Sequence, residues 1–241
     1  MVDVKKMKQY PLIWIISFAC CLSLMCSVLN VSHAVPAPIV LSEPNADAIS
    51  NPIRALHFVL APSVPDFPAV PYRDAEKVIR AAKLAGMNTI IVQIANSINF
   101  DSLPTFTRQG AWSKEELRRL VEIASANEIT LIPELKLLTH QEKFMQGHFP
   151  DLLYNAVTYD PSNSEVYEKI FPLLDELIEL IHPPAIHIGH DEVVGWNARH
   201  AKKKLKAGEK ILPSELFLKD VLTIYSYLKQ RNVETWMWGI C

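Results

Sequence analysis

The chain has 241 residues, of which 49% are apolar and 21% charged, and its formal net charge is −2. This is an ordinary globular composition with enough apolar material for a buried core. The sequence shows no basic excess, and its one lysine-rich run, residues 202–206, is typical of a solvated surface. We therefore expect no nucleic-acid partner.

The first 34 residues have the pattern of a signal peptide. Lysines near the start precede an apolar run from Pro11 to Val31, and Ser32 and Ala34 are small residues at the positions that a signal peptidase reads. We expect cleavage after Ala34 and export to the periplasm or the extracellular space. The alternative is that the apolar run is retained as a membrane anchor, because it approaches the roughly 20 residues that a span requires.

A proline-rich linker is expected at residues 35–52, where Pro36, Pro38 and Pro44 stand among small and polar residues. Three of the four cysteines lie in the first 34 residues and the fourth is Cys241, so we expect no disulfide framework in the exported part. No spacing of cysteine and histidine indicates a structural zinc site. Residues 53–241 are predicted to form the folded domain.

From residue 53 onward, short apolar runs alternate with amphipathic helical patterns. Strands are expected at residues 53–61, 88–95, 129–135, 185–188 and 233–238, and helices at residues 73–85, from 113 onward, at 164–181 and at 214–230. Five strands joined by helices predict a parallel sheet with right-handed crossovers. Both a (β/α)8 barrel and an open doubly wound sheet begin in this way.

Two observations favour the barrel. The first strand is not followed by a Gly-x-Gly-x-x-Gly motif, and no phosphate loop occurs in the sequence, which argues against a nucleotide-binding sheet. With the exception of Arg54, the informative polar residues cluster where successive strands end, as they do in barrels. We predict an α/β fold of the (β/α)8 TIM-barrel type, with about the first five βα units present.

Local signals mark several parts of these elements. Ser113 and Glu116 have the spacing of a capping box, and Ser214 is expected to cap the last helix. Pro172 should bend the early part of its helix. The segment 136–163 is long enough to indicate a functional loop.

The most informative stretch is a short apolar strand, Ala185–Ile188, that stops at two adjacent acids, Asp191 and Glu192. In α/β folds the carboxyl ends of the strands carry ligand sites and catalytic side chains. Two neighbouring acids suit chemistry in which one carboxyl stays protonated and the other charged, as in glycoside hydrolysis. An acidic pair on a solvated loop is the alternative, but the preceding strand, Gly189 and the flanking histidines favour an active site.

The spacing of His187, Gly189, Asp191 and Glu192 resembles glycoside hydrolase family 20, the β-N-acetylhexosaminidases, whose fourth barrel strand ends in a His-x-Gly-x-Asp-Glu motif. The resemblance extends over residues 54–238, which correspond to the first five βα units of the family's barrel. It implies a glycoside hydrolase of carbohydrate metabolism that removes β-linked N-acetylhexosamine from a glycan or oligosaccharide. It implies no cofactor.

The resemblance also implies roles for the residues at the strand ends. Adjacent acids approach the sugar from the same side, so Asp191 is poorly placed to attack the anomeric carbon from behind. In the substrate-assisted retaining mechanism of the family, the 2-acetamido oxygen is the nucleophile. Glu192 would be the general acid and later the base, Asp191 would orient the acetamido group, and Trp238 would pack on its methyl.

Two further residues match sugar-binding positions of the family. Arg54 matches an arginine that holds sugar hydroxyls, although its place before the first strand equally fits a surface arginine at the bottom of a barrel. His140 matches a histidine after the third strand, with a solvated loop histidine as the alternative. Lys136 stands where the family has the aspartate that orients this histidine, and Ile240 replaces an acid that usually follows Trp238.

These two replacements support a rival from another class, a degenerate and non-catalytic carbohydrate-binding barrel. A different barrel glycosidase is the second alternative. A closed barrel pairs its first strand with its eighth, so five strands alone leave two edges and an open pocket. We therefore expect weak catalysis or none from the 241-residue chain by itself.

A metal site is a further alternative, because His187, His190, Asp191 and Glu192 all carry possible ligands. On a strand, positions three apart point to opposite faces, so the two histidines should diverge. We therefore expect no metal site. His187 is predicted to be a buried, hydrogen-bonded residue of the barrel.

Overall fold

The computed structural model describes residues 52–60, 69–141, 145, 147–193 and 210–239. The predicted signal peptide and nearly all of the predicted linker lie outside this part of the chain, and so does Ile240. Within the described ranges, no helix combines the length and the apolar character needed to cross a bilayer. The boundaries placed at residues 34 and 52 stay predictions.

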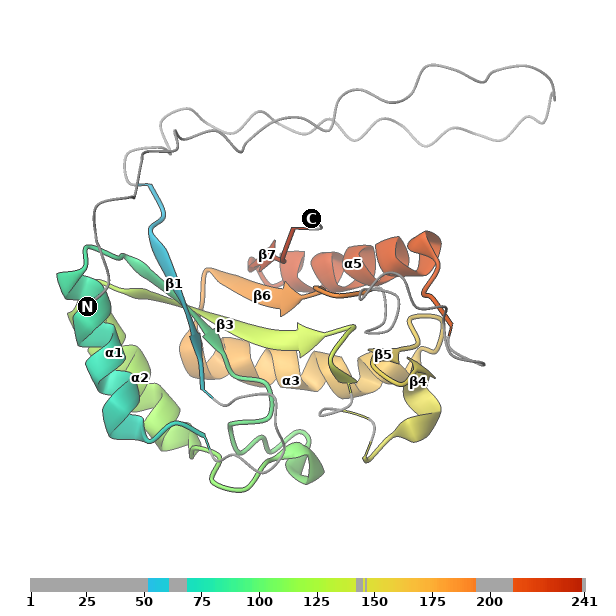
Figure 1. Cartoon of the computed structure of the whole chain (residues 1–241), viewed down its shortest axis with the longest axis horizontal. Helices are drawn as coiled ribbons and strands as arrows, with labels where there is room; N and C mark the ends of the chain where they lie inside the picture. Colours follow the sequence, from blue (N-terminus) through green and yellow to red (C-terminus); the bar gives the residue numbers. More distant parts are fainter. Residues whose placement is uncertain (1–51, 61–68, 142–144, 146, 194–209, 240–241) are drawn as a thin grey trace, which may run out of the picture. The chain divides into compact units, whose positions relative to one another are not determined.

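Five parallel strands form one sheet, and their order in space is β1-β2-β3-β6-β7. Their bounds are Ala55–Val59 for β1, Thr89–Gln93 for β2, Thr130–Leu137 for β3, Ala185–Gly189 for β6 and Glu234–Trp236 for β7. The spatial order follows the chain order (Figure 1). This is the arrangement of consecutive βα units in a barrel, and β1 and β7 are its edges among the described residues.

Among the described residues, four helices and a small hairpin connect the strands. The helices are α1 (Tyr72–Leu84), α2 (Lys114–Ala126), α3 (Glu165–Ile181) and α5 (Ser214–Lys229), with short 3-10 helices at η3 (Pro104–Phe106) and η5 (Pro150–Leu152). The hairpin consists of β4 (Leu153–Asn155) and β5 (Thr158–Tyr159). It lies in the long segment that the sequence marked as functional, between β3 and α3.

Of the two predicted helix caps, the structure confirms one and contradicts the other. The capping box of α2 is present, because Ser113 Oγ accepts the N–H of Glu116 at 3.2 Å and the Glu116 carboxylate accepts the N–H of Ser113 at 2.8 Å. The prediction that Ser214 caps α5 was wrong. Pro213 takes the capping position with an extended backbone, and Ser214 is already the first helical residue.

The ends of two strands also differ from the prediction. β3 continues two residues further than expected, to Leu137, which brings Lys136 into the strand. β7 ends at Trp236 instead of Trp238. The backbone nevertheless stays beside β6, since the N–H of Trp238 donates to the carbonyl of Gly189 at 3.0 Å.

The sheet has two faces, because side chains alternate along each strand. On the helix face, apolar strand residues pack with all four helices in the main core, including Ile90, Leu131, Leu135, Ile186 and Ile188. We call the opposite face the inner face. It carries a small apolar cluster of Ile91, Ile132 and Ala185, against which Trp236 packs.

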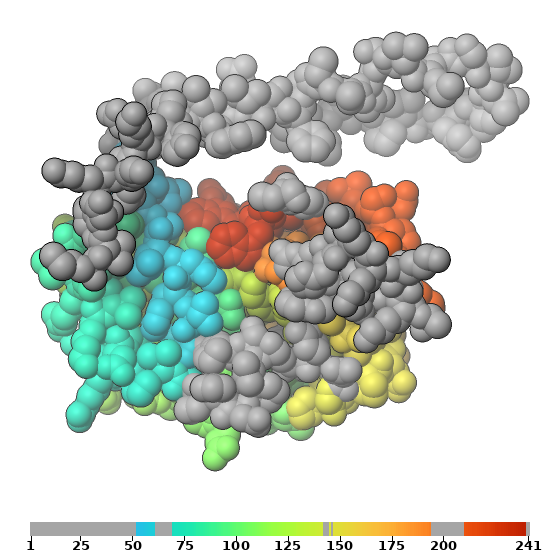
Figure 2. All heavy atoms as spheres, in the orientation of Figure 1, coloured from blue at the N-terminus to red at the C-terminus, as the bar shows by residue number. Residues whose placement is uncertain are grey.

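The space-filling view follows the same order across the domain. The residues of β1 and α1, in blue to green, lie on one side, and those of α5, in orange to red, lie on the other (Figure 2). β3 and β6 are therefore central strands with a neighbour on each side. Side chains at the carboxyl ends of β3 and β6 thus lie in the middle of the sheet and not beside one of its edge strands.

Candidate active site

The chain makes a strained turn directly after β6. Gly189, His190 and Glu192 have φ angles of 78°, 64° and 57°, in the left-handed region that residues other than glycine seldom adopt. Such conformations persist only where surrounding contacts fix them, and they cluster at functional sites. The turn presents Asp191 and Glu192 at the carboxyl end of the sheet, as the sequence predicted.

Gly189 lets β6 approach β3 very closely at this point. A Cβ atom on Gly189 would lie 3.3 Å from the carbonyl oxygen of Leu135 and 3.4 Å from the Cα of Lys136. Both are backbone atoms, which have little freedom to move away. The glycine is therefore required for the close approach of the two strands that carry the site.

β3 contains one extra residue opposite β6. Glu134 pairs with His187, whereas Leu137 pairs with Gly189, so three steps along β3 match two along β6. An extra residue of this kind is a β-bulge, which bends the strand and redirects a side chain. Lys136 lies in the bulge, and its ammonium group reaches across to β6.

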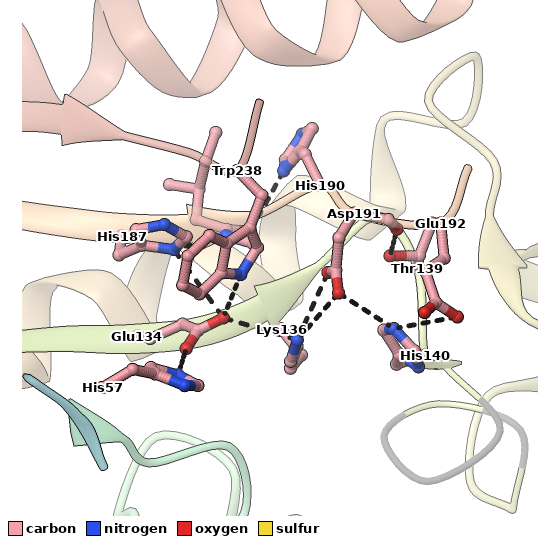
Figure 3. A network of polar contacts seen from close by, with 12 residues as sticks. His57, Glu134, Lys136, Thr139, His140, His187, His190, Asp191, Glu192 and Trp238 are labelled. Atoms are coloured by element: carbon pink, nitrogen blue, oxygen red, sulfur yellow. Dashed lines mark hydrogen bonds and ion pairs between the residues drawn. The ribbon is translucent and has the colours of Figure 1, made fainter. Parts of the chain in front are cut away.

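The carboxylate of Asp191 is held by two basic side chains. Lys136 Nζ lies 3.2 and 3.1 Å from its two oxygens, and His140 Nε2 lies 3.4 Å from Oδ2 (Figure 3). Burial alone would raise the pKa of Asp191, but the contacts with His140 and Lys136 hold it well below its ordinary value. Asp191 is therefore a carboxylate at neutral pH.

Glu192 and the loop after β3 complete this end of the site. His140 Nε2 lies 4.0 Å from Glu192 Oε2, so the imidazole stands between the two acids (Figure 3). The hydroxyl of Thr139 donates to the backbone carbonyl of Asp191 at 2.6 Å. The buried amide of Gln141 donates to the carbonyls of Lys136 and Thr139 at 2.9 and 2.8 Å. The two loops are thus fastened to each other.

Glu134 is the centre of a second group of polar contacts on the inner face. Its side chain is completely buried, accepts from His57 Nε2 at 2.5 Å and from the indole N–H of Trp238 at 3.0 Å, and lies 3.5 Å from Lys136 Nζ. Burial would raise the pKa of Glu134, but the hydrogen bond from His57 and the charge of Lys136 lower it below its ordinary value. Lys136 therefore bridges Glu134 and Asp191.

His187 is buried and hydrogen-bonded, as the sequence predicted, and it is uncharged. Its Nδ1 accepts the backbone N–H of Gly189 at 3.2 Å, and its side chain is almost fully enclosed. Burial lowers the pKa of His187 to about 4, although the nearby Glu134 carboxylate opposes this. Trp238 packs against His187 and His57, with ring centroids 4.5 and 5.1 Å apart.

The structure brings four of the five predicted site residues together. Asp191, Glu192 and His140 are in mutual contact, and Trp238 joins them through Glu134 and Lys136. Arg54 is not among them. It is exposed before β1, and its Nε donates to the carbonyl of Gly86 at 2.6 Å, at the amino-terminal end of the sheet. This position matches the surface arginine that the sequence offered as the alternative.

The sequence analysis did not single out Glu134, and it treated Lys136 only as a departure from the family. A signal was present, because the two charged residues alternate with apolar ones in an otherwise buried strand, which places both on one face. The bulge that directs Lys136 toward Asp191 had no such signal.

One group of possible metal ligands occurs among the described residues, and it differs from the set weighed in the sequence. Ligand atoms of His140, Asp191 and Glu192 lie within 4.8 Å of one another. The ammonium group of Lys136 already contacts both oxygens of Asp191. A cation would have to enter beside this positive charge, so the residues present do not fit a metal ion well.

A model of the catalytic domain of glycosyl hydrolase family 20 matches residues 85–239, which is more than half of the chain. The chain belongs to this family. The match includes the turn after β6, the loop after β3 and Trp238. The family is one of glycosyl hydrolases, and the matched residues include the adjacent acids Asp191 and Glu192.

Two curated relatives are hexosaminidase D from Homo sapiens and from Bos taurus, each 23% identical to this chain, over 154 and 157 residues. The matched parts cover 61% and 62% of this chain, but 32% and 45% of the relatives. The chain therefore spans less than half the length of these proteins.

Solved structures of the family share the fold. Flavobacterium johnsoniae chitobiase has a TM-score of 0.61 at 22% identity, covering 77% of this chain and 31% of its own, and Dispersin B has 0.61 at 16% identity, covering 78% and 58%. At these identities the likeness shows the fold alone. The predicted TIM-barrel-like α/β fold is thus confirmed, whereas its restriction to five βα units stays a prediction.

Proposed function

We propose that the site hydrolyses β-linked N-acetylhexosaminides by a substrate-assisted, retaining mechanism. The observation that carries the proposal is the placement of two neighbouring carboxyl groups, one of them held charged, at the carboxyl end of the sheet. Asp191 is held as a carboxylate by Lys136 and His140, and Glu192 Oε2 lies 4.0 Å from the same imidazole. A charged carboxylate beside a second carboxyl group fits the division into a charged and a proton-carrying member that this chemistry requires.

Glu192 is the proposed proton carrier. It lies half-exposed at the carboxyl end of the sheet, where a glycosidic oxygen can reach it. In the first step Glu192 gives its proton to the leaving oxygen while the acetamido oxygen of the substrate attacks the anomeric carbon. In the second step the Glu192 carboxylate accepts a proton from the water that opens the cyclic intermediate, which restores the acid.

Asp191 is proposed to orient the acetamido group and to stabilise the positive charge that develops on its nitrogen. Its charge is fixed, and its position is set by Lys136 and His140 on one side and by Thr139 on the other. Trp238 is proposed to pack against the acetamido methyl. Its indole N–H is already bonded to Glu134, so the ring has a defined orientation.

Specificity for an N-acetylhexosamine glycan follows from this assignment. The curated relatives are named hexosaminidase D, and one solved relative from Streptomyces plicatus was determined with the product GlcNAc. These names support the substrate class for this chain. The natural glycan is not part of the proposal.

A second function is favoured by one observation. Lys136 contacts both oxygens of Asp191, and an acetamido N–H would have to compete with it for the same acceptor. A site in which Lys136 keeps that place would bind the sugar without hydrolysing it. This is the non-catalytic carbohydrate-binding alternative.

Hydrolysis of a chromogenic N-acetylglucosaminide, compared with the matching glucoside, tests both functions. The proposed enzyme cleaves the first much faster than the second, and Asp191→Asn reduces the rate chiefly for the acetamido sugar. Binding of N-acetylglucosamine without hydrolysis would support the non-catalytic alternative. Equal rates on both sugars would contradict substrate assistance.

We also propose export with removal of residues 1–34, on the basis of the basic start, the apolar run and the small residues before Val35. N-terminal sequencing of the protein recovered from its natural location tests this. A chain that begins at Met1 in the membrane fraction would contradict cleavage and favour an anchor.

A further inference from the structure

A second polar cluster lies directly behind the turn that carries the acids. Its centre is Asp220 on α5, a carboxylate that is completely buried. It accepts hydrogen bonds from the hydroxyls of Tyr159 and Tyr167 and contacts His190 Nε2, each at 2.8 Å. A buried carboxylate is stable only when it is fully paired. These four residues, which we call the Asp220 cluster, meet that requirement.

Hydrogen bonds fix the orientation of the His190 ring in the Asp220 cluster. His190 Nδ1 lies 3.0 Å from the carbonyl oxygen of Ile188, which can only accept, so Nδ1 donates. Asp220 accepts from two tyrosine hydroxyls, and His190 Nε2 lies 2.8 Å from its Oδ2. Both ring nitrogens of His190 are therefore engaged, one by the backbone of β6 and the other by α5.

The two tyrosines keep their protons and act as donors. Burial and the charge of Asp220 raise the pKa of Tyr167 and of Tyr159 well above the ordinary value. Each hydroxyl therefore directs its hydrogen toward Asp220. Together with His190, the tyrosines join α3, β5, α5 and the end of β6 at one point.

The cluster is connected to both loops of the site. His190 immediately precedes Asp191 and has a left-handed backbone, which requires support from its surroundings. The backbone N–H of Tyr159 donates to the carbonyl of Leu138, in the loop that carries His140, at 3.0 Å. Figure 3 shows His190 pointing away from the side on which Asp191 meets Lys136.

We propose that the Asp220 cluster positions Asp191 and Glu192 for catalysis by holding the turn after β6 from behind. The inference rests on the proposed function of these two acids. None of the four residues of the cluster touches the substrate side of the sheet, so they are positioning residues. A displacement of the turn by about 1 Å is expected to reduce the rate on the order of 10²-fold.

The test uses two matched substitutions in the full chain. Tyr159→Phe removes one hydroxyl from the Asp220 cluster. Tyr227→Phe removes a comparable hydroxyl, which donates from α5 to Asp175 on α3 at 2.8 Å but lies away from the site. We expect Tyr159→Phe to lower kcat about tenfold, with KM within about twofold, and Tyr227→Phe to leave both within about twofold.

Asp220→Asn extends the series, because it keeps the shape of the side chain and removes the charge. We expect it to lower kcat further, on the order of 10²-fold. If Tyr159→Phe and Asp220→Asn lower only the melting temperature and leave kcat of the folded protein unchanged, the cluster is merely structural and the proposal is wrong. If Asp220→Asn does not fold, Tyr159→Phe still tests the proposal by itself.

Amide hydrogen exchange separates this proposal from the proposed function. The peptide that spans residues 189–192 is expected to exchange at least about tenfold faster in Tyr159→Phe than in Tyr227→Phe. If exchange is faster in Tyr159→Phe but the wild-type chain does not hydrolyse an N-acetylglucosaminide, the proposed enzymatic function is wrong. The role of the Asp220 cluster in supporting the turn is then retained. Unchanged exchange would overturn the positioning role whatever the activity.

Discussion

In the part of the chain that the structure describes, two carboxylates are completely buried, and the sheet separates them. On the inner face, Glu134 is paired with His57 and Trp238 and lies beside the ammonium group of Lys136. Behind β6, Asp220 is enclosed by two tyrosines and His190. The first cluster leads through Lys136 to the half-exposed Asp191, whereas the second ends in the core. A buried carboxylate thus supports a reactive group in one case and a backbone turn in the other.

Two histidines near the end of β6 show this difference most directly. His187 accepts a backbone N–H through Nδ1, and burial lowers its pKa to about 4, so it is neutral. His190, in the turn after β6, is held by the carbonyl of Ile188 and by the carboxylate of Asp220. The first imidazole therefore belongs to the polar contacts of the inner face, whereas the second fixes the turn from the helix face.

The largest effect that tests the comparison is expected at Glu192. Glu192→Gln removes the proposed proton carrier of the inner face and should lower kcat on an N-acetylglucosaminide on the order of 10²- to 10⁴-fold. Its melting temperature should stay close to that of the wild type. Glu179→Gln, an exposed change on α3, is the matched control. Similar losses in both variants would rule out a specific role for Glu192.

The next effect is on stability and concerns the helix face. Asp220→Ala leaves two tyrosine hydroxyls and His190 Nε2 buried without their shared partner, so the free energy of unfolding should fall by about 3–5 kcal/mol. Asp175→Ala removes a half-exposed carboxylate that pairs with Arg231, and should cost less than about 1 kcal/mol. Chemical denaturation of both variants measures the difference. Equal losses would mean that the enclosure of Asp220 has no energetic consequence.

A third prediction concerns pH and the neutral histidine. The pKa of His187 is lowered on folding, so the unfolded chain binds a proton that the folded one does not. Stability should therefore fall as pH decreases from about 6.5 to about 4, by about 3 kcal/mol, and this contribution should not change further below pH 4.

His187→Asn isolates this contribution, because the amide oxygen can accept the N–H of Gly189 but does not titrate. Unfolding free energies measured at pH 7 and pH 4 should differ by about 3 kcal/mol less in the variant than in the wild type. Identical pH dependence in the two proteins would show that His187 is not the buried neutral group described above.

The smallest expected effect is a shift in the pH profile. Lys136→Met removes the cation that helps to lower the pKa of Asp191, so this carboxyl should become protonated at a higher pH. The acid limb of kcat/KM should move upward, and each unit of the shift costs about tenfold in the ionised fraction. Lys77→Met, at an exposed pair on α1, is the control and should leave the profile unchanged.

A shift in the same direction would support Asp191 as the group that must be charged. A profile that stays in place would remove Lys136 from the electrostatics of the site. A gain in activity at neutral pH would instead show that Lys136 competes with the substrate for Asp191. That last result would show that Lys136 restrains hydrolysis, as the non-catalytic alternative supposes.

The sequence predicted well those features that depend on alternation and local spacing. The parallel sheet, the four helices and the position of Asp191 and Glu192 after β6 all follow from periodicity. The divergence of His187 and His190 follows from the alternation of strand side chains. It needed no knowledge of the neighbouring elements.

The features that the sequence did not predict depend on contacts between distant elements. The helical pattern of residues 214–230 predicts an apolar buried face, whereas the buried residues of α5 are Asp220, Ile224 and Leu228. A charged residue four positions before Ile224 was a signal that this helix face is not purely apolar. Its partners lie on β5, α3 and β6, which no local pattern brings together.

The bulge in β3 makes the site sensitive to deletions in a way that substitutions do not reveal. Glu134 and Leu137 pair with positions only two apart on β6. The two residues between them therefore determine to which face of the sheet each later residue of β3 points. Removal of a single residue there would restore a regular ladder and exchange the faces of Lys136 and Leu137. In a library of single-codon deletions, we expect codons 135 and 136 to be among the least tolerant of β3, even though each position alone accepts conservative replacements.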